Sequence, residues 1–269
     1  MAQKIKPTLV IGGGNMGYSI LTGFKKSGGA MGLVSLLDPL VDVDVAKELG
    51  LKALYRQLKD IPGEAEFGTI VLAVKPQIFA TFESGWCKNL ASTGKVVSIM
   101  AGVAAEHIRL SSGRSCAVVR CMPNLAAAIG KSANVAFTKS TEHKKEFEAL
   151  FSGSGQVHWI EEEDKIHITT AISGSGPAYF FAFIEALAFA GKRAGLDEKF
   201  AMDLSIETMI GSAGLLAEYR SAESLRVSVS SKGGTTAAAL AAFADNNALN
   251  LVVDGAVQAA IARSYALSS

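Results

Sequence analysis

A run of glycines near the start of the chain has the spacing of a site for a phosphate-bearing ligand. Gly12-Gly13-Gly14-Asn15-Met16-Gly17 follows the apolar run Leu9–Ile11 and precedes an amphipathic segment. In that order the first glycine permits a tight turn, Gly14 lets the backbone approach a pyrophosphate, and Gly17 lets a helix pack close to a strand. The free N–H groups at the start of that helix would face the anion. The motif therefore predicts a dinucleotide-binding turn.

Asp38 lies where the ribose-binding carboxylate of such a site is expected. It ends a second apolar run, Leu33–Leu37, about 20 residues after the glycine motif. A carboxylate there binds the ribose 2′-hydroxyl of NADH and repels the 2′-phosphate of NADPH. Lys25, Lys26 or a nearby loop could compensate for that repulsion, so NADH and NADPH both stay open, with NADH slightly favoured.

Turns of small or proline residues end three later predicted strands. They are Ala73-Val74-Lys75-Pro76, Met100-Ala101-Gly102 and Met122-Pro123-Asn124. Ligands of open α/β sheets bind beyond the carboxyl ends of the strands. Each turn alone is compatible with ordinary turn chemistry, but the three together predict a groove for the nicotinamide half of the cofactor.

A second candidate site is the hydroxyl- and glycine-rich loop Ser230-Ser231-Lys232-Gly233-Gly234-Thr235-Thr236, which opens a predicted helix. Free N–H groups, hydroxyls and the positive end of a helix suit a carboxylate ligand. The alternative is that Thr235 or Thr236 simply caps the helix. Four hydroxyls and two glycines in seven residues exceed what capping requires, so an anion site is favoured.

Other catalytic signatures are absent from the sequence. It contains no H-E-x-x-H, no G-x-S-x-G and no cluster with metal-ligand spacing, so we expect no metal. The histidines (His107, His143, His158 and His167) are scattered among polar neighbours and are expected at the surface. The cysteines (Cys87, Cys116 and Cys121) fit no pairing scheme and are interpreted as small core residues rather than redox groups. These absences favour a reaction in which a cofactor performs the chemistry.

Residues 1–162 predict a doubly wound parallel sheet, because short β-branched runs alternate with helical segments. Continuous apolar runs such as Ile70–Val74 are typical of parallel strands covered on both faces. The predicted strands are 8–11, 34–37, 52–54, 69–74, 96–99, 117–120 and 135–138. The predicted helices between them are 16–26, 44–49, 78–89 and 105–110.

Residues 163–269 predict an all-α domain, with helices over 164–172, 177–194, 199–219, 236–246 and 251–265. The helix that begins at Pro177 is apolar nearly all round. A helical domain of this size cannot cover such a helix alone, so we expect it to pack against a second subunit. The alternative is burial within one chain, against the sheet domain.

Length and composition set the broad class of the protein. The 269 residues allow one large or two modest domains, and 49% apolar with 19% charged residues is a globular balance. A net charge of +1 argues against a nucleic-acid partner. Met1–Pro7 does not resemble a signal peptide, and the apolar run Ala178–Ala190 contains Glu185 and is short for a membrane span. We expect a soluble, cytoplasmic protein.

Over the whole chain these motifs resemble pyrroline-5-carboxylate reductase. The resemblance rests on the glycine motif, on Ala73–Pro76 and Met122–Asn124, and on two more specific segments, Ser173–Tyr179 and Gly233–Thr236. It implies an N-terminal Rossmann domain and a C-terminal helical dimerisation domain that interlocks with its twin in a homodimer, and dimers that can associate into rings. It also implies reduction of 1-pyrroline-5-carboxylate to L-proline by NADPH or NADH, the last step of proline synthesis.

Carried over to this sequence, the resemblance assigns the site residues. Thr236 would hydrogen-bond the ring nitrogen of the substrate and is the expected catalytic residue. Ser231, Gly234 and Thr235 would hold the substrate carboxylate, and Glu162 matches an acidic position near the substrate. The expected cofactor contacts are Ile11, Gly12, Gly13, Gly14, Asn15, Met16, Gly17, Asp38, Ala73, Val74, Lys75, Pro76, Met100, Ala101, Gly102 and Asn124.

This sequence departs from the family pattern in three places. Lys232 stands where the family usually has proline, Val227 where it often has an acidic residue, and Leu125-Ala126 where Thr-Pro usually follows the Met-Pro-Asn turn. The first two flank the substrate loop and bear on its contacts. The alternatives are another imine reductase or a β-hydroxyacid dehydrogenase of the same build, or a non-catalytic NAD(P)-binding protein.

Overall fold

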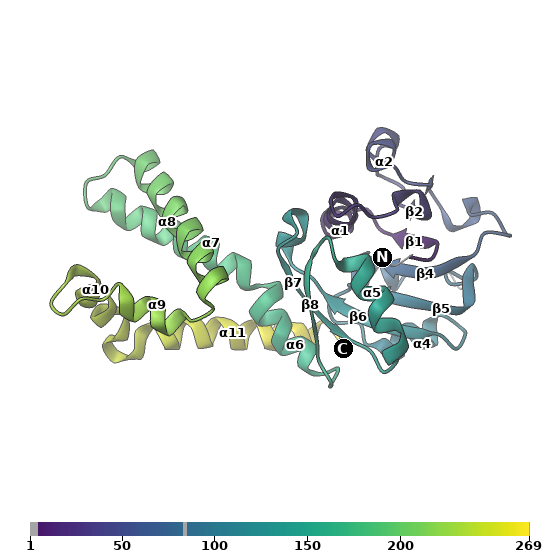
Figure 1. Ribbon diagram of the computed structural model, residues 1–269. Coiled ribbons are helices and arrows are strands. Elements are labelled where there is room, and N and C mark those ends of the chain that lie inside the picture. Colours follow the sequence, from purple (N-terminus) through teal and green to yellow (C-terminus); the bar gives the residue numbers. More distant parts are fainter. Residues whose placement is uncertain (1–4, 83–84, 269) are drawn as a thin grey trace. The chain divides into compact units, whose positions relative to one another are not determined.

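A computed structural model describes residues 5–82 and 85–268 of the chain (Figure 1). Contacts divide these residues into two units, 5–175 with 260–268, and 176–259. The contacts therefore assign residues 163–175 and the end of the chain to the unit that contains the sheet. Composition, in contrast, predicts a domain boundary after residue 162.

An eight-stranded sheet lies at the centre of the described part of the first unit. The strands are β1 (Thr8–Ile11), β2 (Val34–Leu37), β3 (Ala53–Tyr55), β4 (Phe67–Leu72), β5 (Leu90–Ser98), β6 (Ala117–Met122), β7 (Ser132–Phe137) and β8 (Gly155–Trp159). Their order is β3-β2-β1-β4-β5-β6-β7-β8, and the first six have the order of a dinucleotide-binding sheet. Neighbouring strands are parallel except β6 and β7. The short connection after β6 carries no crossover helix, so β7 returns antiparallel.

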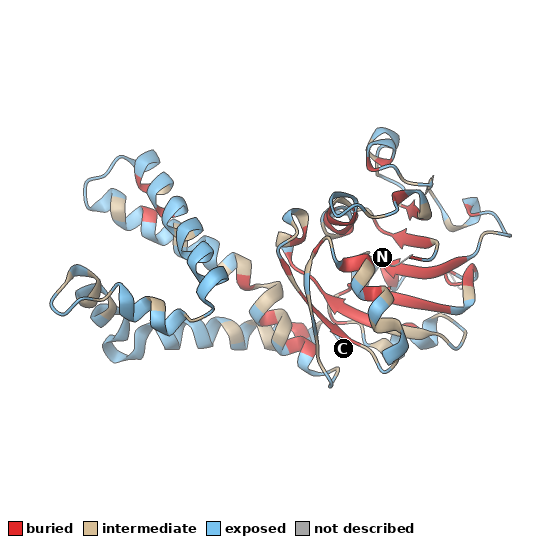
Figure 2. Cartoon of the chain, in the orientation of Figure 1, coloured by how far each residue is buried: buried red, intermediate tan, exposed pale blue. Residues whose placement is uncertain are grey.

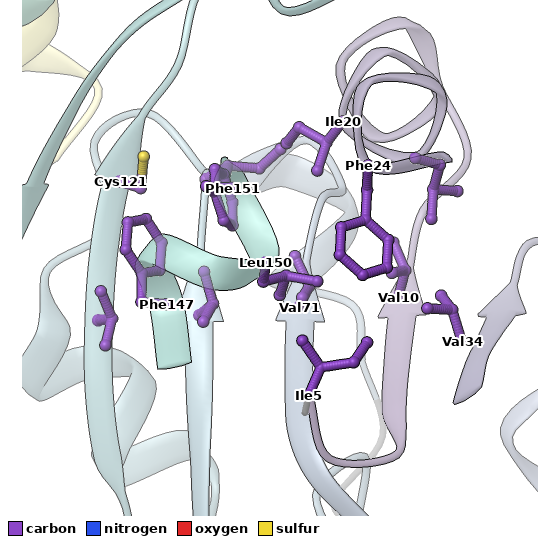
Figure 3. Close-up of a cluster of buried hydrophobic side chains, with 14 of the residues drawn as sticks. Ile5, Val10, Ile20, Phe24, Val34, Val71, Cys121, Phe147, Leu150 and Phe151 are labelled. Atoms are coloured by element: carbon purple, nitrogen blue, oxygen red, sulfur yellow. The ribbon is translucent and has the colours of Figure 1, made fainter. Parts of the chain in front are cut away.

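Helices cover both faces of this sheet. They are α1 (Asn15–Lys26), α2 (Val43–Leu49), α3 (Pro76–Phe79), α4 (Ala105–Ser111), α5 (Lys144–Phe151) and α6 (Lys165–Thr169), the last continuing into a π-helical segment, Thr170–Gly174. On one face Phe24 of α1 and Phe147 and Phe151 of α5 pack over Val10 and Val71 (Figure 3).

The opposite face is covered by a different set of side chains. A buried cluster forms here around Leu9 and Ile11 of β1. It includes Phe79 of α3, Ile108 of α4, and Trp86, which lies outside both helices. Consecutive strand residues point to opposite faces, so a strand covered on both faces is apolar at every position. This explains the continuous apolar runs in the sequence.

The α/β class and the predicted strands are confirmed, and three elements differ from expectation. The predicted helix over 78–89 is wrong, because α3 ends at Phe79 and Gly85 has a φ of +98°, which no α-helix contains; residues 83 and 84 lie outside the described residues. Helix α5 and strand β8 were not predicted. The doubly wound sheet is parallel, as predicted, except that β6 and β7 run antiparallel.

The second unit consists of helices: α7 (Gly176–Arg193), α8 (Glu198–Tyr219), α9 (Ala222–Ser228), α10 (Thr235–Ala244) and most of α11 (Ala248–Ala266). α7 and α8 pack against each other, with Ala188 and Ala201 buried. Large apolar side chains such as Phe181, Phe189 and Ile210 stay more than half exposed. Figure 2 shows these helices mostly in the pale blue of exposed residues. Contacts within this unit do not bury them, so another surface must.

Two helical stretches of the described chain are long and apolar enough to cross a membrane, Lys165–Arg193 and Glu198–Tyr219. The first contains the apolar run Ala178–Ala190 and extends beyond it at both ends. Length and composition alone do not distinguish such a helix from one that packs on another protein surface.

Candidate functional site

A cavity of about 480 Å³ lies at the carboxyl ends of β1, β4 and β5. Three separate turns contribute its lining, which consists of Gly14, Asn15, Met16, Ala73, Val74, Lys75, Pro76, Ile99, Met100 and Ala101. The turns meet because β1 pairs with β4, and β4 with β5. The glycine motif and two of the three predicted turns are thus brought together, whereas Met122–Asn124 contributes no lining residue.

The glycines of the motif serve different purposes. A Cβ on Gly12, whose φ is +104°, would lie 2.6 Å from the carbonyl oxygen of Ala73, and a Cβ on Gly17 would lie 2.2 Å from that of Gly12. Packing of the turn against its neighbours therefore requires both glycines. A Cβ on Gly14 would meet no atom within 4 Å, although Gly14 lines the cavity. Its lack of a side chain leaves room for a ligand at the backbone, as a pyrophosphate requires.

The start of α1 suits an anionic ligand. Its N-cap residue, Gly14, makes no side-chain capping bond, and the first turn contains no acidic residue. The N–H groups of this turn have no partner within the helix, and the helix dipole favours negative charge there. Cavity, glycine and helix end together fit a dinucleotide cofactor.

Asp38 follows β2 and is bonded to the glycine motif. Its Oδ2 accepts a hydrogen bond from the N–H of Gly13 at 2.7 Å, and its Oδ1 accepts from Leu40 at 2.7 Å and Val41 at 3.1 Å. The carboxylate therefore holds both the glycine turn and the loop after β2 in place. Its half-buried position keeps it accessible for a ribose.

Arg56 is the cation beside Asp38. Its Nη1 donates to the carbonyl oxygen of Asp38 at 3.2 Å and to that of Val41 at 2.5 Å. Lys25 and Lys26, which the sequence suggested as compensating charges, instead donate to backbone carbonyls elsewhere. Arg56 is therefore a cation held beside Asp38 that the sequence analysis did not identify.

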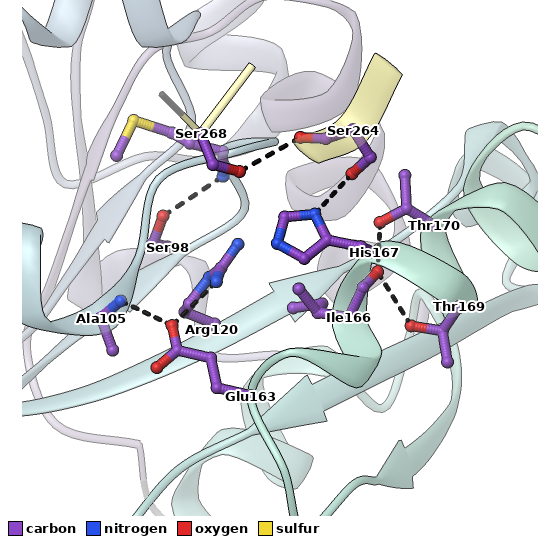
Figure 4. Close-up of polar contacts among 11 residues, drawn as sticks. Ser98, Ala105, Arg120, Glu163, Ile166, His167, Thr169, Thr170, Ser264 and Ser268 are labelled. Carbon is purple, nitrogen blue, oxygen red and sulfur yellow. Dashed lines mark hydrogen bonds and ion pairs between the residues drawn. The ribbon is translucent and has the colours of Figure 1, made fainter. Parts of the chain in front are cut away.

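The end of the chain docks on the first unit through a polar cluster (Figure 4). His167 of α6 and Ser264 of α11 share a hydrogen bond, with Nδ1 and Oγ 2.8 Å apart. The ring of His167 stacks on that of Tyr265 at 4.1 Å, and the Tyr265 hydroxyl donates to Asp164 at 2.6 Å. The last turn of α11 is therefore fastened to α6.

His167 is buried, so its predicted surface position is wrong. Burial lowers its pKa, and the positive charge of Arg120 lowers it further. The Arg120 side chain is itself buried and forms an ion pair with Glu163, with Nη1 and Oε1 2.8 Å apart. The same Glu163 oxygen accepts the N–H of Ala105 at 2.7 Å, at the start of α4.

Two predicted site residues are engaged elsewhere in the first unit. Glu162 is exposed and pairs with Lys165 at 2.7 Å, whereas the adjacent Glu163 points inward. The Asn124 side chain is buried, where it donates to the carbonyl oxygen of Ser173 at 3.0 Å and accepts from Ala126 at 3.1 Å. The predicted contact of Glu162 with substrate and that of Asn124 with the cofactor stay predictions.

The hydroxyl-rich loop of the second unit leads into α10. Gly234 is the N-cap residue, so the alternative that Thr235 or Thr236 caps the helix is wrong. The backbone turns at Gly233, whose φ is +72°, and Gly234 donates to the carbonyl oxygen of Ser231 at 3.0 Å. Among the described residues, nothing bonds to the hydroxyls of Ser231, Thr235 and Thr236. Three hydroxyls at the positive end of a helix are thus left available to a ligand.

Sequence reasoning also missed two residues of the cofactor region. Ile99 lines the cavity one residue before the predicted Met100 turn, and its place at a strand end was a usable signal. Leu267 packs against Gly102, the last residue of that turn. No sequence signal indicates the second contact, because it joins segments far apart in the chain.

Comparisons with known proteins agree with this arrangement. Residues 163–267 match the family model described as pyrroline-5-carboxylate reductase dimerisation, and residues 8–102 match that of NADP oxidoreductase coenzyme F420-dependent. A pyrroline-5-carboxylate reductase of Haemophilus influenzae is 33% identical over 270 residues, covering 96% of each chain. One from Pseudomonas aeruginosa is 32% identical, covering 96% of this chain and 95% of that protein.

Solved structures are similar over the same extent. A pyrroline-5-carboxylate reductase from Coxiella burnetii superposes with a TM-score of 0.90 at 30% identity, covering 99% of this chain and 100% of the other. A Plasmodium falciparum pyrroline carboxylate reductase with NADP bound superposes with a TM-score of 0.81 at 26% identity, covering 98% of each chain.

Proposed function

Because the chain belongs to the pyrroline-5-carboxylate reductase family, we infer that it reduces 1-pyrroline-5-carboxylate to L-proline with NADH or NADPH. The observation that carries this conclusion is the likeness to reductases over nearly the full length of both chains. The reaction completes the synthesis of proline. The cavity of the first unit and the hydroxyl-rich loop of the second unit supply the two kinds of binding surface that the reaction requires.

We propose that the cavity holds the cofactor. When bound, the reduced nicotinamide supplies a hydride to the imine carbon of the substrate. The N–H groups at the start of α1 hold the pyrophosphate beside Gly14, and Asp38 holds the adenosine ribose. The remaining proposed contacts are Ile11, Gly12, Gly13, Asn15, Met16, Gly17, Ala73, Val74, Lys75, Pro76, Met100, Ala101, Gly102 and Asn124.

The loop before α10 is proposed to bind the substrate. Ser231, Gly234 and Thr235 hold its carboxylate, with support from the positive end of the helix. Thr236 hydrogen-bonds the ring nitrogen and is the proposed catalytic residue. A protonated cyclic imine accepts a hydride readily, so these residues bind and orient it and no strong protein acid is needed. Glu162 is placed near the substrate on the family resemblance alone.

The function is tested by following the loss of NADH or NADPH absorbance with 1-pyrroline-5-carboxylate, compared with a panel of other cyclic imines and of hydroxy- and ketoacids. We expect turnover with 1-pyrroline-5-carboxylate to exceed that with every panel member. Preference for another imine would favour a broader imine reductase, and turnover of a ketoacid alone would favour a hydroxyacid dehydrogenase. Cofactor binding without any turnover would favour a non-catalytic protein.

We propose that the exposed apolar helices of the second unit form a homodimer interface. The match of residues 163–267 to a dimerisation family and the exposure of Phe181, Phe189 and Ile210 support this assignment. Phe189→Glu should convert the dimer to monomer in sedimentation velocity, whereas Lys59→Glu, in the first unit, should leave it dimeric. A Phe189→Glu dimer as stable as wild type would contradict the interface.

A dimer also accounts for the two apolar helical stretches without a membrane, and we propose a cytoplasmic protein. Recovery of the protein in the membrane fraction of lysed cells would contradict this. Association of dimers into a ring is the further assembly that the family resemblance implies, and sedimentation at high protein concentration tests it.

A further inference from the structure

Two cysteines that are far apart in the sequence lie together at the amino-terminal ends of β5 and β6. Cys87 precedes β5 and Cys116 precedes β6, and these strands are parallel neighbours. Both side chains belong to one apolar cluster, and the two thiols are close enough to influence each other's ionisation. Arg114 joins the two segments, because its Nη1 donates to the carbonyl oxygens of Leu90 at 2.7 Å and Cys87 at 3.4 Å. The pair therefore lies at the amino-terminal ends of the strands, whereas the proposed cofactor cavity lies at their carboxyl ends.

The two thiols differ in their access to solvent. Cys87 is 1% exposed, whereas Cys116 is half-buried and lines cavities of about 280 Å³ and 420 Å³. The Ser112 hydroxyl lies 3.6 Å from the Cys116 sulfur. A small reagent can therefore reach Cys116 through either cavity, whereas Cys87 is almost completely covered.

The surroundings of Cys116 stabilise its thiolate. Interaction with Cys87 and with Ser112, together with the charges of Arg114 and Arg109, lowers the pKa of Cys116 to about 6 despite burial. Interaction with Cys116 and burial raise the pKa of Cys87, which stays protonated. A partly exposed thiolate in positive surroundings is the reactive form of cysteine. Cys121 differs, because it is fully buried and burial alone raises its pKa.

We propose that Cys116 and Cys87 form a peroxide-sensitive dithiol, in which Cys116 is oxidised first and Cys87 then closes a disulfide with it. The Cys116 thiolate attacks one oxygen of hydrogen peroxide, the O–O bond breaks, and sulfenic acid and hydroxide form. The Cys87 sulfur then displaces the hydroxyl from the Cys116 sulfur, giving the disulfide and, with the thiol proton, water. The two thiols lose two electrons in all, and peroxide is reduced to water.

Closing the disulfide requires the sulfur atoms to approach to about 2.05 Å. Both cysteines lie in the connections before their strands rather than in the sheet, so the movement falls on these connections and not on the strand pairing. The proposal is independent of the reductase activity, because neither cysteine lines the cofactor cavity or belongs to the substrate loop.

The test is peptide mapping by mass spectrometry of the reduced full-length protein, before and after treatment with hydrogen peroxide. In the reduced protein, brief iodoacetamide treatment at pH 7 should label Cys116 at least tenfold faster than Cys121. After peroxide, a peptide pair linked through Cys87 and Cys116 should appear, and dithiothreitol should abolish it. Cys121→Ala is the matched control and should leave the linked pair unchanged.

Removing either partner separates the two steps. Cys116→Ser should abolish peroxide consumption by the protein, whereas Cys87→Ala should leave a sulfenic acid on Cys116 that dimedone traps. If Cys87→Ala does not fold, the wild-type map still decides. Oxidation of Cys116 to sulfinic acid with no linked peptide, or faster labelling of Cys121 than of Cys116, would overturn the proposal.

Discussion

Gly102 lies directly against the backbone of Leu267. A Cβ on Gly102 would come within 2.5 Å of the Leu267 carbonyl oxygen. Gly102 follows Ala101, which lines the cavity, and Leu267 follows the Ser264 that is bonded to His167. The end of the chain, fastened to α6, therefore supports one of the turns that form the proposed cofactor site.

Gly102→Ala should destabilise the protein and weaken cofactor binding together. Its φ of +77° is strained for alanine, and the new methyl must displace Leu267, so we expect a loss of about 1–3 kcal/mol in unfolding free energy. Gly113→Ala is the matched control, because Gly113 has a φ of +65° but open space around it. Chemical denaturation and cofactor titration measure both effects. Equal losses in the two variants would mean that the Leu267 contact is unimportant.

Gly14→Ala should leave stability unchanged and weaken NADH and NADPH binding by about tenfold or more, a loss of about 1.4 kcal/mol. The added methyl meets only open space in the free protein, but it occupies the place proposed for the pyrophosphate. Gly17→Ala should instead lower the melting temperature, since its methyl would lie 2.2 Å from the Gly12 carbonyl oxygen. Fluorescence titration and thermal unfolding distinguish the two. Wild-type cofactor affinity in Gly14→Ala would place the pyrophosphate elsewhere.

Asp38→Asn should shift cofactor preference towards NADPH. It removes the charge that repels a 2′-phosphate and retains an oxygen that can accept a backbone N–H. Arg56, beside Asp38, then acts on the phosphate without opposition. The ratio of kcat/KM for NADPH to that for NADH should rise about tenfold or more. A ratio unchanged from wild type would show that Asp38 does not face the ribose.

Thr236→Ala should lower kcat/KM for 1-pyrroline-5-carboxylate by about tenfold or more, with cofactor affinity nearly unchanged, because it removes a proposed bond to the ring nitrogen. Thr236→Ser keeps the hydroxyl and should restore most of the activity. Ser230→Ala is the control, since the Ser230 hydroxyl already donates to the backbone carbonyl oxygen of Arg226 at 2.6 Å. Wild-type turnover in Thr236→Ala would refute the role.

The docking of the chain end should weaken in acid. Burial lowers the pKa of His167 below its unfolded value of 6.5, so the unfolded chain binds the proton more readily than the folded one. Stability from this group is therefore complete above pH 6.5 and is lost as pH falls through the lower folded pKa. His167→Gln stays neutral, so its melting temperature should depend less on pH between 7 and about 5. The exposed His158→Gln should follow wild type, and a wild-type pH profile in His167→Gln would contradict this assignment.

Features of the site that depend on residues close together in the sequence could be predicted, and features that depend on distant residues could not. The glycine motif, the strand ends at Ala73 and Met100, and the helices over 177–194 and 199–219 were all predicted from residue type and spacing. Local periodicity also contained the signal for α5, where Phe147, Leu150 and Phe151 recur at helical spacing. The helix predicted over 78–89 failed because α3 ends at Phe79 and the positive φ of Gly85 excludes a helix there; Trp86 reaches the same cluster as Phe79 from outside α3.

By itself, the sequence determined the α/β class and the turns that carry the cofactor motif, because those signals depend on residues close together in the chain. Only the tertiary structure decided which turns share a cavity, because strand order is a long-range property. It also separated Gly14 from the glycines that packing requires, buried His167 and placed Cys87 beside Cys116. Burial and contacts depend on which distant segments of the chain pack around a residue, and local residue spacing does not show which segments these are.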